Sequence, residues 1–241
     1  MKKYKNLYIN GCSFTAGDNI IDGKTWPDLL SKKLNLYLIN HSVNGNSMQS
    51  ITFNSVNHLI KLNNQDTLVV IGLTWPPRYM IQIGKGVVNF SPAFLDKSDK
   101  SVVFSTFRRV SVPYSKNKID IDDYVLNINE QDGVIIVKKF VDYYKSLIQY
   151  DDNLLENQKL NQITQIILLQ SFLKQNNFEY RIVNFNQLET YPNKPLYKKL
   201  DKSKVINFNA SWIKLYTDDT AHPTEMGCEN ITEVIYDSIN K

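Results

Sequence analysis

Apolar and polar positions along the chain follow two alternating patterns. Short apolar runs at residues 7–9, 36–39 and 66–72 predict buried strands, and the third is a continuous series rich in β-branched residues, as in strands covered on both faces. Residues 25–34 and 48–62 instead carry apolar side chains at helical spacing. Strands that alternate with helices predict an α/β fold, in which helices cover both faces of a mostly parallel sheet.

The second half of the chain continues this alternation. Helical spacing at residues 134–150 and 153–175 predicts two helices, and residues 180–184 predict a further strand. Residues 187–210 are irregular, with room for one short helix. A closing helix is expected over about residues 223–239, because proline is tolerated at a helix start.

The alternation of strands and helices is interrupted between these halves, at about residues 76–132, where prolines, glycines and aromatic residues are frequent. A structureless loop of that length is unusual inside a compact domain. We therefore predict a single domain over residues 1–241, with an insertion after the third strand that has some structure of its own. The aromatic side chains of this region either form its own core or stack as a lid over a substrate: Trp75, Phe90, Phe94, Phe104, Phe107, Tyr114 and Tyr124.

Composition narrows the possible classes of protein. A net charge of +4, with lysines scattered in pairs, predicts no nucleic-acid surface. Two cysteines cannot build a disulfide framework and fit a reducing compartment. No apolar run has the length of a signal-peptide core or a membrane span, so a cytoplasmic protein without membrane contact is expected. The three histidines lack metal-ligand spacing, and we expect no metal and no other cofactor.

The residues that can carry chemistry lie near the two ends of the chain. The first predicted strand runs into residues 11–17, Gly-Cys-Ser-Phe-Thr-Ala-Gly, which hold Ser13 at the carboxyl end of that strand, where parallel sheets bind ligands. Far along the chain, Asp219 precedes His222 by three residues, a spacing that lets the carboxylate reach Nδ1 of the ring. Ser13, His222 and Asp219 together supply the nucleophile, base and orienting acid of a serine hydrolase.

Alternatives remain open at several of these positions. Asp218 could replace Asp219, and either could instead cap the last helix or lie exposed. The thiol of Cys12 could be the nucleophile in place of the serine hydroxyl. Of the other histidines, His41 lies in a Gly-rich turn and His58 on a polar helical stretch, where an exposed position is expected.

Three segments together resemble the SGNH, or GDSL-type, hydrolase superfamily. Residues 11–17 resemble a Gly-Cys-Ser-Phe-Thr-x-Gly form of its nucleophile block, residues 40–47 resemble its second block, and residues 219–223 match its final Asp-x-x-His-Pro block. The resemblance spans nearly the whole chain and implies a three-layer αβα, flavodoxin-like fold. It also implies an oxyanion hole that includes the N–H groups of Ser13 and Gly45.

The third block departs from the family pattern. Residues 72–78 read Gly-Leu-Thr-Trp-Pro-Pro-Arg, so Thr74 stands where the family has an asparagine whose amide donates to the oxyanion. Either Thr74 donates through its hydroxyl, or Asn46 or Asn44 fills this role, or the enzyme is slow. A further alternative is that catalysis is lost and only binding remains.

The predicted activity is hydrolysis of a carboxylic ester, on a carbohydrate or another small polar molecule, through an acyl-enzyme. Arg78, Trp75 and Asn46 are predicted to bind the substrate, although Arg78 could instead pair with an acid of the insertion. Two other functions remain open: a non-catalytic module that binds a glycan or a partner, and transfer of the acyl group to an alcohol.

Overall fold

The computed structural model describes residues 4–17, 20–75, 78–83, 86–90, 92–95, 102–104, 110–111, 154–185, 195–217 and 222–240. A five-stranded sheet runs through the molecule in the order β10-β9-β3-β1-β2, and every neighbouring pair is parallel. Its strands are β1 Asn6–Asn10, β2 Tyr37–Asn40, β3 Thr67–Gly72, β9 Glu179–Phe185 and β10 Val205–Phe208. The order reverses at β1, between β2 and β3, which is the switch point where ligands of flavodoxin-like folds bind.

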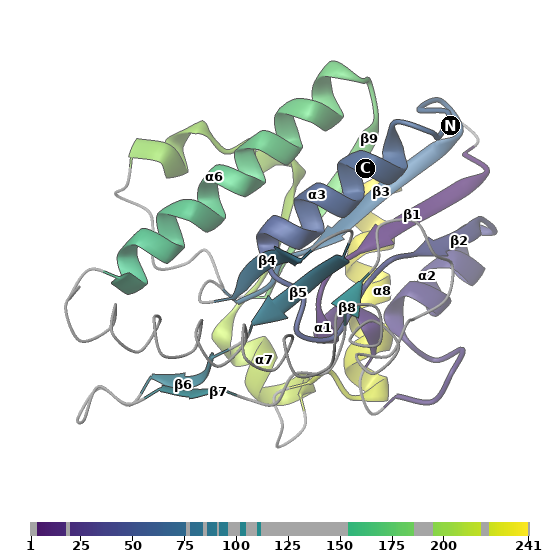
Figure 1. The fold of residues 1–241 in the computed structure, drawn as a ribbon. Coiled ribbons are helices and arrows are strands. Elements are labelled where there is room, and N and C mark those ends of the chain that lie inside the picture. Colours follow the sequence, from purple (N-terminus) through teal and green to yellow (C-terminus); the bar gives the residue numbers. More distant parts are fainter. Residues whose placement is uncertain are drawn as a thin grey trace.

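Helices cover both faces of this sheet, as Figure 1 shows. On one face α3 (Met48–Leu59) and α6 (Leu154–Gln175) pack against Tyr8, Val69 and Ile71. On the other, α2 (Trp26–Leu34) and α8 (Glu225–Asn240) pack against the alternate residues Leu7 and Leu68. Alternate side chains of a strand point to opposite faces, so the apolar runs form two cores. The predicted three-layer αβα architecture is confirmed.

Side-chain caps define where helices α2 and α3 begin. Thr25 precedes α2, and its side chain accepts a hydrogen bond from the N–H of Asp28. Ser47 precedes α3 and accepts from the N–H of Ser50. Side-chain oxygens at these positions satisfy N–H groups that have no acceptor within the helix. Helix α3 ends at Leu59, three residues before the predicted end.

The stretch predicted to be irregular holds more structure than expected. It contains the short 3-10 helices η1 Pro195–Lys199 and η2 Lys202–Lys204, and then strand β10. Strand β10 is only four residues long, pairs with β9 alone and exposes Asn207, so its apolar pattern is too short to recognise. Helix α7, Ala210–Tyr216, follows it. The helix predicted at 134–150 lies outside the described residues.

Two small antiparallel sheets follow β3. Strands β4 Tyr79–Ile83, β5 Gly86–Phe90 and β8 Val110–Ser111 form one of them. Strands β6 Pro92–Leu95 and β7 Val102–Phe104 form the other. They are separate from the parallel sheet, so the predicted insertion after the third strand is confirmed, while its end near residue 132 stays a prediction.

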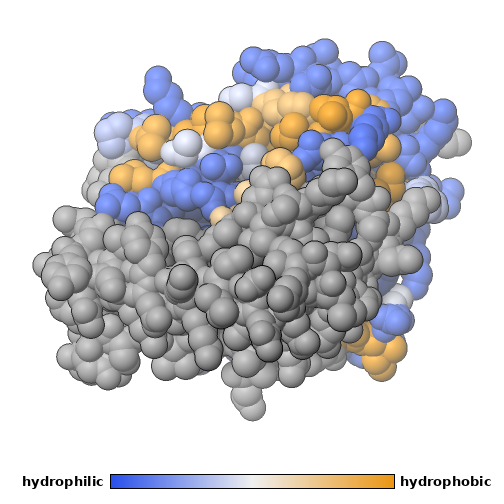
Figure 2. Space-filling model, viewed as in Figure 1, coloured by the Kyte–Doolittle hydropathy of each residue, from blue (hydrophilic) through white to orange (hydrophobic). Residues whose placement is uncertain are grey.

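The outer surface of the α3 and α6 layer is mixed in polarity. Figure 2 shows apolar residues gathered there and interrupted by hydrophilic ones. Leu168 of α6 and Leu196 of η1 are among the exposed apolar side chains. Within the part of the chain that the structure describes, no helix has the length and apolar character needed to span a bilayer.

Candidate active site

The predicted nucleophile lies in a tight turn at the carboxyl end of β1. Helix α1 spans only Ser13–Ala16; Cys12 before it is extended, and Gly17 after it has φ of 80°. Ser13 is therefore the first residue of this turn and is buried. Among the described residues its hydroxyl has no hydrogen-bond partner.

This turn packs tightly on the end of β3. A Cβ on Gly11 would lie 2.2 Å from Thr15 Oγ1, and one on Gly72 would lie 2.1 Å from the same atom. Thr15 is fully buried. Both glycines are therefore required by the lack of space around the Thr15 side chain, which holds the Ser13 turn against β3.

The second predicted block follows β2 and lies against the same turn. The N–H of Val43 donates to Gly11 O at 3.2 Å, and the N–H of Asn46 donates to Val43 O at 3.1 Å. Gly45 between them has φ of 74°, a conformation that favours glycine. A Cβ at Gly45 would meet no heavy atom within 4 Å, so this part of the turn faces open space.

Asn46 joins the second block to the nucleophile turn. Its Nδ2 donates to Gly11 O at 3.1 Å and lies 3.5 Å from Asn10 Oδ1. The Asn46 side chain is fully buried, which differs from the predicted contact with substrate. In this arrangement Asn46 positions the turn. Asn44, the other candidate donor, is half-buried, and its role stays a prediction.

The hydroxyl proton of Thr74 is already used in a hydrogen bond within the protein. The Oγ1 of Thr74 donates to Asn46 O at 2.7 Å, and the side chain is fully buried. A hydroxyl carries one proton. That proton therefore serves the buried carbonyl, so the observed geometry does not support the predicted donation from Thr74 to an oxyanion.

Arg78 and Trp75 lie beside this contact. The Arg78 guanidinium donates from Nη1 to Thr74 Oγ1 at 2.9 Å, and the same nitrogen lies 3.5 Å from Asn46 O. Trp75 is 57% exposed, an unusual position for an indole ring. The structure thus brings the two predicted binding residues to the carboxyl edge of β3. The alternative pairing of Arg78 with an acid of the insertion concerns residues outside the described part.

His222 reaches the same edge from the other end of the chain. Its ring centroid lies 5.6 Å from that of Phe14, the residue after Ser13. Thr217 and Pro223 form an antiparallel bridge, and the N–H of Thr224 donates to Tyr216 O at 2.9 Å, so the ends of the loop before α8 are closed together. Asp218 and Asp219 lie outside the described residues.

The other histidines form a pair that the sequence did not reveal. His58 is half-buried rather than exposed, and its ring stacks on His41 with centroids 3.8 Å apart. Burial lowers the pKa of His41 to about 4, and the neighbouring His58 adds to this effect. Burial and then Lys61 lower the pKa of His58. Both rings are therefore neutral near pH 7.

The two cysteines are buried thiols. Cys12 Sγ lies 3.7 Å from Leu73 O, to which it donates a weak hydrogen bond. Burial raises the pKa of Cys228 to about 11. Within the described ranges, no three His, Cys, Asp or Glu side chains lie close enough to hold a metal ion.

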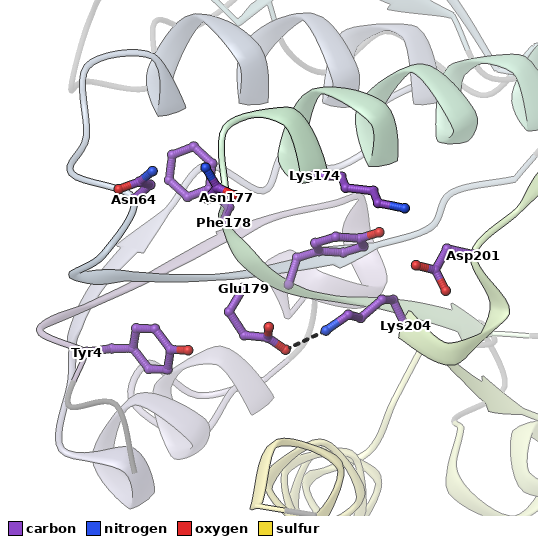
Figure 3. A pocket seen from close by; sticks show the side chains of 9 residues that line it. Tyr4, Asn64, Lys174, Asn177, Phe178, Glu179, Asp201 and Lys204 are labelled. Atoms are coloured by element: carbon purple, nitrogen blue, oxygen red, sulfur yellow. Dashed lines mark hydrogen bonds and ion pairs between the residues drawn. The ribbon is translucent and has the colours of Figure 1, made fainter.

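A separate pocket of about 400 Å³ lies at the opposite, amino-terminal edge of the sheet. Figure 3 shows Lys204 reaching toward Glu179 at the start of β9, and their ion pair is 2.8 Å long. Arg181 also pairs with Glu179. Burial alone would raise the pKa of Glu179, but hydrogen bonds and charges from Lys204 and Arg181 lower it below the ordinary value. The charge of Glu179 in this pocket is therefore already neutralised by its neighbours.

Comparisons with known proteins agree with the architecture. No family model matches the sequence, and no curated protein matches it. A lipolytic protein of the G-D-S-L family from Veillonella parvula is 10% identical, with 98% of this chain and 99% of that chain covered and a TM-score of 0.52. The psychrotrophic esterase EstA from Pseudoalteromonas sp. is 14% identical, with coverages of 98% and 97% and a TM-score of 0.50.

An acetyl xylan esterase is 10% identical, with coverages of 97% and 99% and a TM-score of 0.51. At such low identity these likenesses concern the fold. They extend over almost the full length of both chains in each case. The chain therefore has the three-layer fold of the GDSL-type, or SGNH, hydrolases that its sequence resembles.

Proposed function

We propose that this protein is a serine esterase that cleaves a carboxylic ester through an acyl-enzyme. The observation that carries the proposal is the meeting of His222 with Phe14, beside Ser13, although the two segments lie near opposite ends of the chain. They meet at the carboxyl edge of the sheet next to the switch point, where α/β folds of this order bind ligands.

The mechanism assigns one role to each of three side chains. His222, oriented by Asp219, takes the proton from Ser13 as the hydroxyl oxygen attacks the ester carbonyl. The alcohol then leaves with that proton, and water, activated by the same imidazole, hydrolyses the acyl-enzyme. The Ser13 hydroxyl and His222 are not hydrogen-bonded in this structure, and such contacts often tighten only when substrate binds.

Two main-chain groups form the proposed oxyanion hole. They are the N–H of Ser13, at the start of α1, and the N–H of Gly45, in the turn that faces open space. A third donor of the kind supplied by the family's asparagine is not expected from Thr74, because its proton serves Asn46 O. Loss of one oxyanion donor costs roughly 10²–10³ in turnover, so we expect a slow esterase.

The proposed substrate is an acyl ester of a carbohydrate or another small polar molecule. The exposed indole of Trp75 next to this edge can stack on a sugar ring, and the half-buried Arg78 adds a hydrogen-bond donor beside it. The acetyl xylan esterase among the similar folds is compatible with this class of substrate.

The test is turnover of p-nitrophenyl acetate by the wild type and by Ser13→Ala and His222→Ala. We expect each variant to lose at least about 10³-fold in kcat/KM, because members of such a set act as a unit. Ser171→Ala is the matched control, since Ser171 is exposed on α6 and its hydroxyl donates to Ile167 O of the same helix. We expect Ser171→Ala to keep full activity.

Labelling by an organophosphate probe gives an independent readout of the nucleophile. Mass spectrometry should find the phosphonyl group on Ser13 and none on the Ser13→Ala variant. Labelling of Ser13→Ala on Cys12 would assign the nucleophile to the thiol. Equal background rates in the wild type and both variants would favour a binding module, and ester products with an added alcohol would favour acyl transfer.

A further inference from the structure

Asn10 is a fully buried asparagine at the carboxyl end of β1. Its Oδ1 accepts a hydrogen bond from the N–H of Gly11 at 2.8 Å and lies 3.5 Å from Asn46 Nδ2. Its Nδ2 donates to Ile51 O at 3.2 Å and to Ser55 Oγ at 3.0 Å. An asparagine side chain can accept two hydrogen bonds and donate two, so all of this capacity is in use.

These contacts join three segments of the candidate site. Gly11 leads into the turn that carries Ser13, and Asn46 directly follows Gly45. The two acceptors of the Asn10 amide lie on α3, which begins two residues after Asn46. The side chain of Asn10 therefore connects the turn that holds one proposed oxyanion donor with the turn that holds the other.

Gly11 is held on both sides as a result. Its N–H donates to Asn10 Oδ1. Its carbonyl oxygen accepts from the N–H of Val43 at 3.2 Å and from Asn46 Nδ2 at 3.1 Å. The N–H of Ser13 belongs to the next peptide group along the chain. A change at Asn10 is therefore expected to move the two turns relative to each other.

We infer that Asn10 is a positioning residue, which sets the spacing between the N–H groups of Ser13 and Gly45. This inference rests on the proposed esterase function and adds a residue that acts on the site through Gly11 and Asn46. Oxyanion donors work only within a narrow range of distances from the charge that forms in the transition state. Misplaced donors weaken transition-state binding and leave ground-state binding nearly unchanged, so kcat falls while KM stays the same.

The experiment replaces Asn10 by leucine, which is similar in volume and makes no side-chain hydrogen bond. For p-nitrophenyl acetate, kcat of Asn10→Leu should fall roughly 10- to 100-fold, because small misplacements at a catalytic site have effects of this size. The KM should stay within about twofold of the wild-type value.

Asn10→Asp is the conservative variant, and it also tests the inference if leucine prevents folding. Burial keeps the new carboxyl group protonated, so it can accept from the N–H of Gly11 and donate one hydrogen bond to α3. Because one hydrogen bond is lost, kcat should fall by only about three- to tenfold, again with little change in KM.

Asn54→Leu is the matched control. Asn54 is also a buried asparagine, and its Nδ2 donates to Ser50 Oγ of the same helix at 3.3 Å. We expect wild-type kcat and KM for this variant. Active-site titration with an organophosphate counts the competent Ser13 groups in each preparation. A merely structural role of Asn10 would lower that count and leave kcat per titrated site unchanged, whereas the inference requires a lower kcat per titrated site.

Amide hydrogen exchange, followed by NMR, separates this inference from the esterase proposal. The N–H groups of Val43 and Asn46 are hydrogen-bonded in the turn before α3. They should exchange roughly tenfold faster in Asn10→Leu than in Asn54→Leu, while Val70 in the buried strand β3 exchanges equally in both.

The outcomes distinguish the two proposals. Faster exchange at Val43 and Asn46 in a protein without Ser13-dependent turnover would overturn the esterase proposal and still support the coupling of the two turns by Asn10. Unchanged exchange and unchanged kcat per titrated site in Asn10→Leu, with Ser13-dependent turnover intact, would overturn the inference and leave the esterase proposal standing.

Discussion

The two edges of the parallel sheet use polar side chains in different ways. At the amino-terminal edge Glu179 is held by Arg181 and Lys204, whose ion pairs with it are partly exposed. At the carboxyl-terminal edge Asn46 and Thr74 are fully buried and bond to main-chain carbonyl oxygens. Partly exposed ion pairs contribute little because water screens them, whereas a buried polar group that loses its partner is costly. Rigidity is therefore concentrated where the candidate site lies.

The two edges differ in packing as well. At the carboxyl edge the Thr15 side chain fills the space between Gly11 and Gly72, leaving no room for a methyl group on either glycine. At the amino edge there is a pocket of about 400 Å³. A site that must hold a hydroxyl and two main-chain donors in fixed positions needs the first arrangement and not the second.

The largest loss of stability is expected from Gly72→Ala at the carboxyl edge. The new Cβ would lie 2.1 Å from Thr15 Oγ1, and the buried Thr15 side chain or the turn that carries it must shift to relieve this contact. Such overpacking lowers the free energy of unfolding by about 3 kcal/mol, at the upper end of its usual range. Urea denaturation measures the loss, and we expect esterase activity to fall with it because Ser13 lies on the shifted turn.

A second substitution tests this explanation. Thr15→Ala removes the hydroxyl that the new methyl group meets, and the Thr15 Cβ itself would lie 3.4 Å away, an ordinary contact. The double variant should therefore be more stable than Gly72→Ala alone. A double variant that unfolds at the same urea concentration as the single one would exclude the Thr15 contact as the cause.

The next largest effect is expected from Thr74→Val. Removing the hydroxyl takes a donor from the buried Asn46 carbonyl, which should lower the free energy of unfolding by about 2 kcal/mol. Turnover of a neutral ester should fall by less than about tenfold, because an oxyanion donor would cost roughly 10²–10³. Thr74→Ser, which keeps the hydroxyl, is the control. A hundredfold loss of turnover in Thr74→Val, with turnover kept in Thr74→Ser, would show that the Thr74 hydroxyl does donate to the oxyanion.

The fold could be predicted from the sequence because the central strands are continuous apolar runs. Strand β3 is buried along its whole length, and the alternation of strands and helices then implies parallel pairing. Strand β10 was missed because it is a half-covered edge strand of four residues. Burial on both faces leaves a strong signal in a sequence, and burial on one face of a short strand leaves little.

The sequence predicted which residues belong to the candidate site, but not the hydrogen bonds and ring contacts that they make with other segments. Spacing singled out Ser13 and His222, and the structure brings their segments together through Phe14. Spacing could not reveal that the Thr74 proton is taken by Asn46 O, because the direction of a hydroxyl depends on an acceptor from another segment. The stacking of His41 on His58 is of the same kind, since the rings come from the end of β2 and from α3.

That histidine pair predicts how stability depends on pH. The pKa of His41 is lowered from 6.5 to about 4, mainly by burial. Between these values the unfolded chain binds a proton that the folded chain does not, so stability is fully present above pH 6.5 and falls as the pH drops toward 4. Because the ring is partly exposed, we expect a loss on the order of 1 kcal/mol.

The control for this effect is His41→Phe, which keeps an aromatic ring on His58 and removes the titration. Urea denaturation at a series of pH values should give a smaller loss of stability in this variant than in the wild type. Parallel curves for the two proteins would mean that His41 titrates with the same pKa in the folded and unfolded chains, and that other groups cause the loss.

The smallest effect is expected from Glu179→Gln at the amino edge. The substitution removes the charge from two partly exposed ion pairs, and the amide can still accept a hydrogen bond from Lys204 or Arg181. The free energy of unfolding should fall by no more than about 1 kcal/mol, and this difference should shrink in high salt because the lost term is a screened charge interaction. Esterase activity should match the wild type, since Glu179 begins β9 at the edge opposite Ser13. A loss as large as that of Thr74→Val, or lower activity, would show that the amino edge is as firmly coupled to the site as the carboxyl edge.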